Sequence, residues 1–144
     1  MSKASHKQAL YELVCRYAQA VDQRDWAALS RLFTPQATLK GPGFSFDGIT
    51  AIVESMNGLS HYSRTQHHIH NHLAEVDDVE ASAETYCVAN HLYEAEGISR
   101  KLDWGIRYRD RFACMDGIWH FTCRELLLDW SQDLPLQGAP HETC

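Results

Sequence analysis

Four histidines fall within the short segment TQHHIHNHL, residues 65–73. Imidazole is the side chain that changes charge nearest to neutral pH, so this segment is a candidate for acid–base chemistry or for metal binding. The segment has the pattern of a strand. Alternation along a strand would place one set of side chains toward a pocket, namely Thr65, His67, Ile69, Asn71 and Leu73. We therefore expect His67 to be a buried imidazole, and His68, His70 and His72 to face solvent.

A metal site is the alternative interpretation of the same histidines. Alternate residues on a strand can chelate one ion, and His68, His70 and His72 have that spacing. The sequence offers no carboxylate or cysteine at a recognisable spacing to complete the set. We therefore predict a solvated polar face and no metal.

Asp22 is the carboxylate that we expect to meet His67. Apolar residues between Ser5 and Asp22 recur at helical spacing, and Asp22 lies at the edge of their stripe, at the C-terminal end of the predicted helix. A carboxylate there opposes the helix dipole and needs a compensating partner. Asp25 is suited to N-cap the next helix, which leaves Asp22 without an obvious structural role. A histidine beside such a carboxylate is a general base for proton abstraction.

The remaining pattern predicts a single α+β domain that spans residues 1–144, with a core of about residues 5–130. We expect helices over 5–22, 26–33 and 48–57, the last capped by Asp47 and ended by Gly58. Two short strands, 37–40 and 44–46, precede four long ones, 65–76, 81–94, 101–115 and 118–130. Three helices followed by a long meander indicate helices packed on one face of a curved sheet. The tail, 131–144, is predicted to be a loop.

Composition excludes several functional classes. The net charge of −6 and the scattered Lys and Arg residues argue against a nucleic-acid surface. No apolar stretch approaches the roughly 20 residues of a membrane span, and the N-terminus has no apolar signal region, so we expect a cytoplasmic protein. The five cysteines are odd in number and contain no CxxC pair, which predicts reduced thiols rather than a disulfide framework.

Arg124 interrupts a largely apolar final strand, and the hairpin register decides which way it faces. A two-residue Asp116-Gly117 turn would put it opposite Arg109, whereas a three-residue turn with a glycine bulge would put it opposite Tyr108. We prefer the second register because it avoids facing like charges. Arg124 would then share a face with Asp110, either as a structural ion pair or as a cation that stabilises a leaving group or an enolate oxygen.

Three segments carry a family resemblance, and together they span about residues 8–130. They are YAQAVDQRDW (17–26), RTQHHIHNH (64–72), and YRDRF with DGIWHF (108–112 and 116–121). This combination resembles the SnoaL-like branch of the nuclear-transport-factor-2-like superfamily, which are cone-shaped α+β proteins. The resemblance implies a curved sheet that encloses a pocket, no cofactor, and a homo-oligomer, either a dimer or a trimer.

Two groups of enzymes in this branch, the scytalone dehydratases and the hexachlorocyclohexane dehydrochlorinases, use an Asp–His pair that matches Asp22 and His67. The second histidine of the dehydratases matches His91, and the arginine of the dehydrochlorinases matches Arg124. Two positions depart from these patterns: Val21 stands where the dehydratases have tyrosine, and Tyr17 where the dehydrochlorinases have lysine. As substrate contacts we expect Tyr17, Trp26, Asn71 and Tyr108.

The function that these residues predict is a cofactor-independent lyase of the dehydratase type, acting on a small, apolar, cyclic substrate. His67 would remove a carbon-bound proton, and His91, Tyr17 or Arg124 would assist the leaving group or polarise a carbonyl. An isomerase or a polyketide cyclase would need the same base. A non-catalytic ligand-binding module, or a small subunit like that of the ring-hydroxylating dioxygenases, is the competing class.

Overall fold

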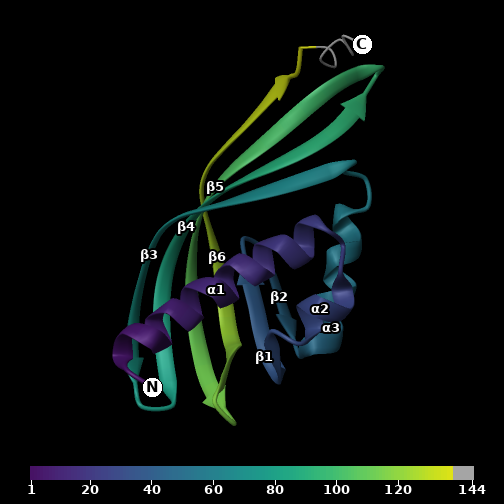
Figure 1. Ribbon diagram of the computed structural model, residues 1–144. Coiled ribbons are helices and arrows are strands. Elements are labelled where there is room, and N and C mark those ends of the chain that lie inside the picture. The colour runs from purple at the N-terminus through teal and green to yellow at the C-terminus, as the bar shows by residue number, and fades with distance from the viewer. Residues whose placement is uncertain (138–144) are drawn as a thin grey trace, which may run out of the picture.

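A six-stranded mixed sheet, with order β2-β1-β6-β5-β4-β3, forms the centre of the computed structural model, which describes residues 1–137 (Figure 1). All neighbouring strands are antiparallel except β1 and β6, which run parallel. The strands are β1 (Phe33–Gly41), β2 (Phe44–Asp47), β3 (Arg64–Asp77), β4 (Glu80–Ala95), β5 (Ile98–Met115) and β6 (Ile118–Pro135). The helices are α1 (Lys3–Asp22), α2 (Trp26–Ser30), α3 (Ile49–Ser55) and a 3₁₀ turn, η1 (Met56–Leu59).

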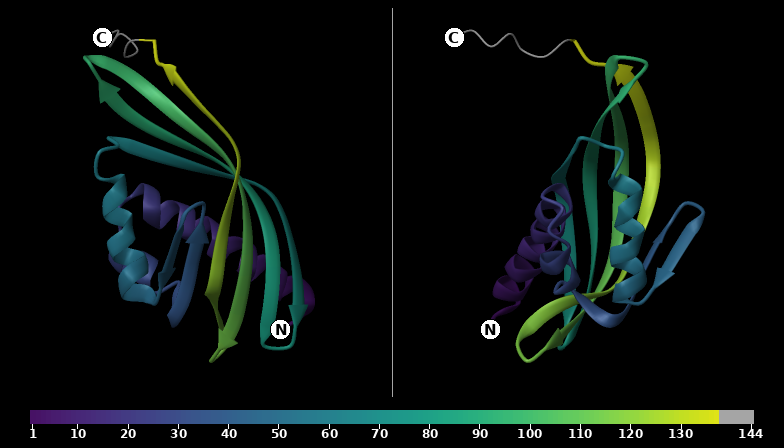
Figure 2. Two further views of the ribbon diagram at one scale, coloured as in Figure 1. Left: turned by 180° about the vertical axis from the view of Figure 1, so that it is seen from behind. Right: turned by 90° about the vertical axis from the view of Figure 1, so that its right-hand side faces the viewer.

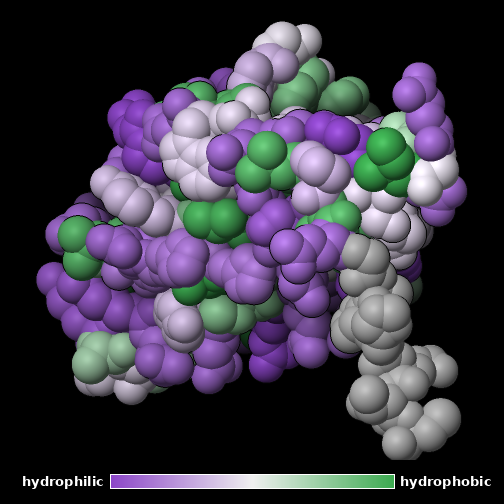
Figure 3. Space-filling view, turned by 90° about the horizontal axis from the view of Figure 1, so that it is seen from above, coloured by the Kyte–Doolittle hydropathy of each residue, from purple (hydrophilic) through white to green (hydrophobic). Residues whose placement is uncertain are grey.

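The sheet is strongly curved but not closed, and α1 lies across one of its faces (Figures 1 and 2). The long helix packs mainly on β3, and α3 packs on β1. The ends of β4, β5 and β6 extend beyond the helices (Figure 1). Seen from that end, apolar side chains form separate patches in a mostly hydrophilic surface (Figure 3). This arrangement confirms the predicted α+β fold.

Local sequence accounts for most of the helix ends. Ser2 caps α1 through its side chain, which accepts a hydrogen bond from the Ser5 amide, and the apolar stripe of α1 is buried as predicted. The Asp25 carboxylate caps α2 by accepting from the amide of Ala28, at 3.0 Å. The tight turn between α1 and α2 puts Arg24 in the left-handed region, with φ of 57°.

Several predicted boundaries are wrong, each because a strand pairing competes with a local signal. The second helix ends at Ser30, and β1 already begins at Phe33, which pairs with Phe121 of β6. Pro35 lies in the irregular part of β1, where a missing amide hydrogen is tolerated. Asp47 ends β2 and accepts a hydrogen bond from Thr38, so Gly48 caps α3 in its place.

Two further boundaries differ from the sequence prediction. Gly58 does not end the third helix but lies inside the 3₁₀ turn η1. Strand β6 continues through residues 131–135, where a loop was predicted, because it stays paired with the first residues of β5. Residues 136–137 follow the strand without regular structure, as predicted, and residues 138–144 lie outside the described residues.

A β-bulge in β3 changes the face of every residue that follows it. Ile69 pairs with Cys87 and His72 with Thr85, so three steps on β3 match two on β4. Because side chains alternate with a period of two, the extra residue reverses the pattern. Asn71 and Leu73 are therefore exposed, whereas His72 turns inward and its Nδ1 lies 2.8 Å from Thr85 Oγ1. The predicted placements of Asn71 toward the pocket and His72 toward solvent are wrong.

A second bulge, in β6, decides where Arg124 lies. The Asp116-Gly117 turn has two residues, both with positive φ, and Met115 pairs with Ile118. Phe112 pairs with Phe121 but Arg111 pairs with Cys123, so one residue of β6 is extra. Arg124 consequently faces Asp110, and neither of the two predicted registers is correct.

The Arg124–Asp110 pair is buried in the aromatic core. Both side chains are inaccessible to solvent, and Arg124 Nε lies 3.1 Å from Asp110 Oδ1. The guanidinium carbon lies 4.1 Å from the ring centre of Tyr17 and 3.5 Å from that of Tyr108. The N–H bonds are not directed at the carboxylate, and within residues 1–137 neither charged group has a hydrogen-bond partner. Burial raises the pKa of Asp110 to about 7, against the opposing charge of Arg124.

This raised pKa makes the stability of the protein depend on pH. A carboxyl group whose pKa is higher in the folded state stabilises the fold fully below its unfolded pKa, 3.8, and loses that contribution as the pH rises through about 7. Relative to Asp110→Asn, the wild-type free energy of unfolding should fall across that window by up to about 1.4 kcal/mol per pH unit. Urea denaturation at several pH values measures it. A constant difference would mean that Asp110 is ionised throughout.

Candidate active site

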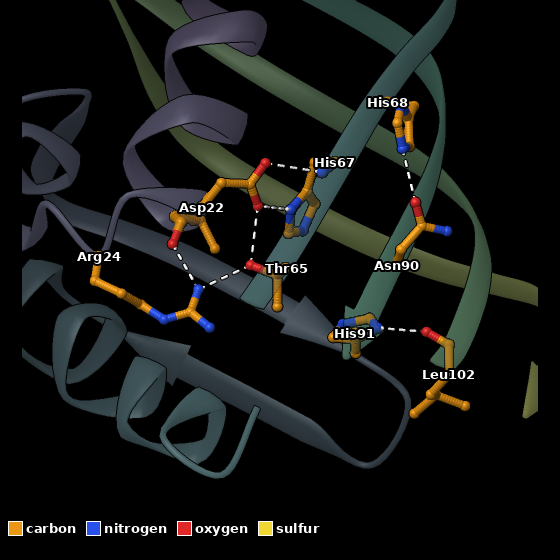
Figure 4. A network of polar contacts seen from close by, with 9 residues as sticks. Asp22, Arg24, Thr65, His67, His68, Asn90, His91 and Leu102 are labelled. Carbon is orange, nitrogen blue, oxygen red and sulfur yellow. Dashed lines mark hydrogen bonds and ion pairs between the residues drawn. The ribbon is translucent and has the colours of Figure 1, made fainter. Parts of the chain in front are cut away.

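Asp22 and His67 meet where the C-terminal end of α1 approaches the start of β3 (Figure 4). His67 Nδ1 lies 2.6 Å from Asp22 Oδ1, and the His67 backbone amide donates to Asp22 Oδ2 at 2.8 Å. The His67 side chain is only 8% exposed, whereas that of Asp22 is 23% exposed. The two residues predicted to form a dyad therefore lie in direct contact.

The Asp22 carboxylate accepts three hydrogen bonds, since the Thr65 hydroxyl also donates to Oδ1 at 2.9 Å. Partial burial alone would raise the pKa of Asp22, but the hydrogen bonds and charge of His67 and the bond from Thr65 bring it below its ordinary value. An ionised carboxylate can only accept, so Nδ1 of His67 carries the proton in this contact. In the neutral ring with this tautomer, the other nitrogen, Nε2, has a free lone pair and can act as a base.

Arg24 and Thr65 belong to the same network, and the sequence did not assign a role to either. Arg24 Nη1 donates to Thr65 Oγ1 and to the Val21 carbonyl oxygen, each at 2.8 Å. Thr65 is 1% exposed. Its position two residues before His67, on the same strand face, is the one signal in the sequence that could have indicated it.

His91 on β4 is the second buried imidazole, with 3% exposure. Its Nδ1 lies 3.0 Å from the Leu102 carbonyl oxygen, which can only accept, so this nitrogen carries the proton. Burial lowers the pKa of His91 despite the opposing effect of that hydrogen bond, and favours the neutral ring. Its ring centre lies 6.4 Å from that of His67 and is flanked by Tyr62, at 4.9 Å, and Trp104, at 5.0 Å. Sequence patterns gave no indication of these two aromatic neighbours.

The other candidates lie apart from this hydrogen-bonded group. Tyr17, Tyr108 and Arg124 form the aromatic ion-pair cluster of the core. Trp26 opens α2 and packs, partly buried, against the core. Asn71 is exposed at the β3 bulge. The structure thus unites Asp22 with His67 and brings His91 near them. The five other candidates, expected as substrate contacts or leaving-group aids, are not part of this network.

Two surface hollows reach the dyad. One, of about 410 Å³, lies along α1 and β3 and is lined by Tyr11, Cys15, Gln19, Asp22, His67 and Ile69 among others. The other, of about 490 Å³, is lined by Asp22, Arg24, Thr65 and their neighbours. Across residues 1–137 no group of three His, Cys, Asp or Glu side chains is placed to hold a metal. Over the same range no helix is long and apolar enough to cross a membrane.

The fold is shared with solved structures. Hexachlorocyclohexane dehydrochlorinase (LinA) Type2 superposes with a TM-score of 0.83 at 19% identity, covering 97% of each chain. The "Putative Scytalone Dehydratase" of Novosphingobium aromaticivorans gives 0.81 at 24% identity, covering 98% of this chain and 96% of its own. A "putative aromatic ring hydroxylase" of the same species gives 0.80 at 19% identity, covering 94% and 96%.

At these identities the likenesses show the fold and not the reaction. No curated protein sequence matches the chain. The sequence model of the SnoaL-like domain matches residues 2–125, which include the helix that carries Asp22, the strand that carries His67, and Arg124 near its end. The chain therefore belongs to the SnoaL-like domain family.

Proposed function

We propose that the protein is a cofactor-independent lyase that removes water from a small, largely apolar, cyclic hydroxy-carbonyl compound. The observation that carries this proposal is the 2.6 Å contact between Asp22 and His67, beside surface hollows of about 410 and 490 Å³. Membership in a family with dehydratase and dehydrochlorinase neighbours supports the class of reaction. A cytoplasmic location and a homo-oligomer remain expectations from the sequence.

In this proposal His67 is the base that starts the elimination. Its Nε2 takes a proton from the carbon next to the carbonyl group, and the ring becomes an imidazolium. Asp22 stabilises that cation through Nδ1 and keeps the ring in the required tautomer. General-base catalysis of this kind contributes about 10²- to 10⁴-fold to a rate. The low exposure of the His67 side chain, 8%, limits competition from water for these charges.

His91 would hold the hydroxyl group that leaves. Because its Nδ1 proton is engaged by Leu102, the neutral ring presents an acceptor at Nε2, which suits the O–H of a substrate. The His67 imidazolium can then return its proton to the departing oxygen. The C–H and C–O bonds break, a carbon–carbon double bond forms, and one water molecule leaves with no other reagent consumed.

Two features favour loss of water over loss of halide. A halide has no proton to donate to His91, so that acceptor would be unused. Arg124, the cation that could attract a halide, is already opposed by Asp110 and enclosed by aromatic rings.

The dyad is tested with a panel of cyclic β-hydroxy ketones, following water loss by the absorbance of the conjugated product. Asp22→Asn and His67→Gln should each lower kcat/KM by at least about 100-fold, since each removes the base or its orienting charge. His68→Gln is the matched control, because His68 is exposed and bonds Asn90 instead. Equal rates in the wild type and both dyad variants would refute the proposal.

The role of His91 is tested by changing the variant and the leaving group together. His91→Phe keeps a ring between Tyr62 and Trp104 but removes the acceptor. With a β-hydroxy ketone, kcat/KM should fall about tenfold or more, the value of one hydrogen bond. With the matching β-chloro ketone, which has no O–H, the two proteins should differ little. An equal loss on both substrates would indicate that His91 only maintains packing.

A further inference from the structure

The Asp22 carboxylate is held by a chain of hydrogen bonds that starts outside the dyad. The chain runs from the Arg24 guanidinium to the Thr65 hydroxyl, at 2.8 Å, and from there to Asp22 Oδ1, at 2.9 Å (Figure 4). Asp22 Oδ1 also meets His67 Nδ1, at 2.6 Å. Four side chains from the end of α1, the following turn and β3 are therefore connected in one line.

The direction of each bond in this chain is determined by chemistry. A guanidinium group can only donate, so Thr65 Oγ1 must accept from Arg24. The hydroxyl has a single hydrogen, which is then free for Asp22. Without Arg24, the hydroxyl oxygen would lose this donor, and the direction of its hydrogen toward Asp22 would be less restricted.

Arg24 also secures the end of the helix from which Asp22 projects. The same Nη1 atom bonds the carbonyl oxygen of Val21, one residue before Asp22. A cation at this end of a helix offsets the negative end of the dipole, which otherwise disfavours a carboxylate there. Arg24 has a φ of 57°, a conformation that non-glycine residues rarely adopt, and this backbone directs the side chain back across the helix end.

We propose that Arg24 is a positioning residue for the dyad, acting through Thr65, and that together they hold Asp22 in the orientation that keeps the His67 proton on Nδ1. The inference rests on the proposed function for its catalytic meaning, because only a base needs Nε2 free. The hydrogen-bond chain itself can be tested without any substrate.

The test is an NMR titration of the full-length protein in four forms: wild type, Arg24→Asn, Thr65→Val and the double variant. Asparagine tolerates the left-handed backbone, and valine keeps the shape of threonine without its hydroxyl. Carboxyl ¹³C shifts report the pKa of Asp22, and long-range ¹H–¹⁵N correlations report the His67 tautomer. Asp22→Asn and His67→Gln assign the signals.

Both single variants should raise the pKa of Asp22 toward its ordinary value and mix the two His67 tautomers. The effect of the double variant should fall short of the sum of the two single effects, because Arg24 acts mainly through the hydroxyl and only in part through Val21. Thr65→Ser should restore the wild-type titration. On an active hydroxy ketone, each single variant should lose about tenfold in kcat/KM, the value of one hydrogen bond to a charged group.

Additive effects of the two substitutions, or an unchanged titration in Arg24→Asn, would overturn the proposal. Arg31→Gln is the control for loss of one exposed arginine elsewhere in the same region. If Arg24→Asn does not fold, as circular dichroism would show, Arg24→Gly with its freer backbone takes its place. A changed titration without any loss of activity would count against the mechanism and not against this chain of bonds.

Discussion

The contact between Asp22 and His67 joins the C-terminal end of α1 to the start of β3, two elements that the buried apolar stripe of α1 already packs together. A carboxylate at the C-terminal end of α1 opposes the helix dipole, and a lone imidazole on β3 would be buried at a cost. The contact offsets both costs. Asp22 receives donors from the side chain and backbone of His67 and from Thr65, and the buried imidazole gains an acceptor in Asp22. The contact fixes how the end of α1 meets the start of β3, beside the two hollows that reach the dyad.

Two aspartates in this small protein show how much hydrogen bonding decides the behaviour of a buried acid. Asp22 is partly buried and accepts three hydrogen bonds, and its pKa is lowered. Asp110 is fully buried beside an arginine, yet its pKa is raised, because the cost of burying the charge exceeds the effect of Arg124 and no N–H within the described residues is directed at the carboxylate to offset it. For this fully buried carboxylate, a nearby cation without well-directed donors does not offset the cost of burial. This difference supports a catalytic interpretation of Asp22 and a structural one of Asp110.

The parts of the fold that a sequence can predict are those determined by local patterns of residue types. The stripe of α1, the Asp25 cap, the Asp116-Gly117 turn and the four long strands all follow from spacing and turn chemistry. The two bulges do not, because an extra residue in one strand is defined only relative to its partner. Asn71 and Arg124 were misplaced for this reason, whereas His67 was placed correctly because it precedes the first bulge.

The same distinction explains why the dyad could be found and its support could not. Asp22 and His67 have residue types that stand out at their positions, a carboxylate at the wrong end of a helix and an imidazole on a mixed face. Arg24 and Thr65 are ordinary in a turn and at the start of a strand, and only the left-handed backbone of Arg24 brings them together. The role of Arg24 is visible in its geometry and not in its residue type. Many side chains could occupy position 24, but few could donate to both the Val21 carbonyl and the Thr65 hydroxyl. Related structures should therefore be searched for this pair of hydrogen bonds and not for an arginine and a threonine at these positions. The bonds identify the chains in which the carboxylate is oriented toward the histidine.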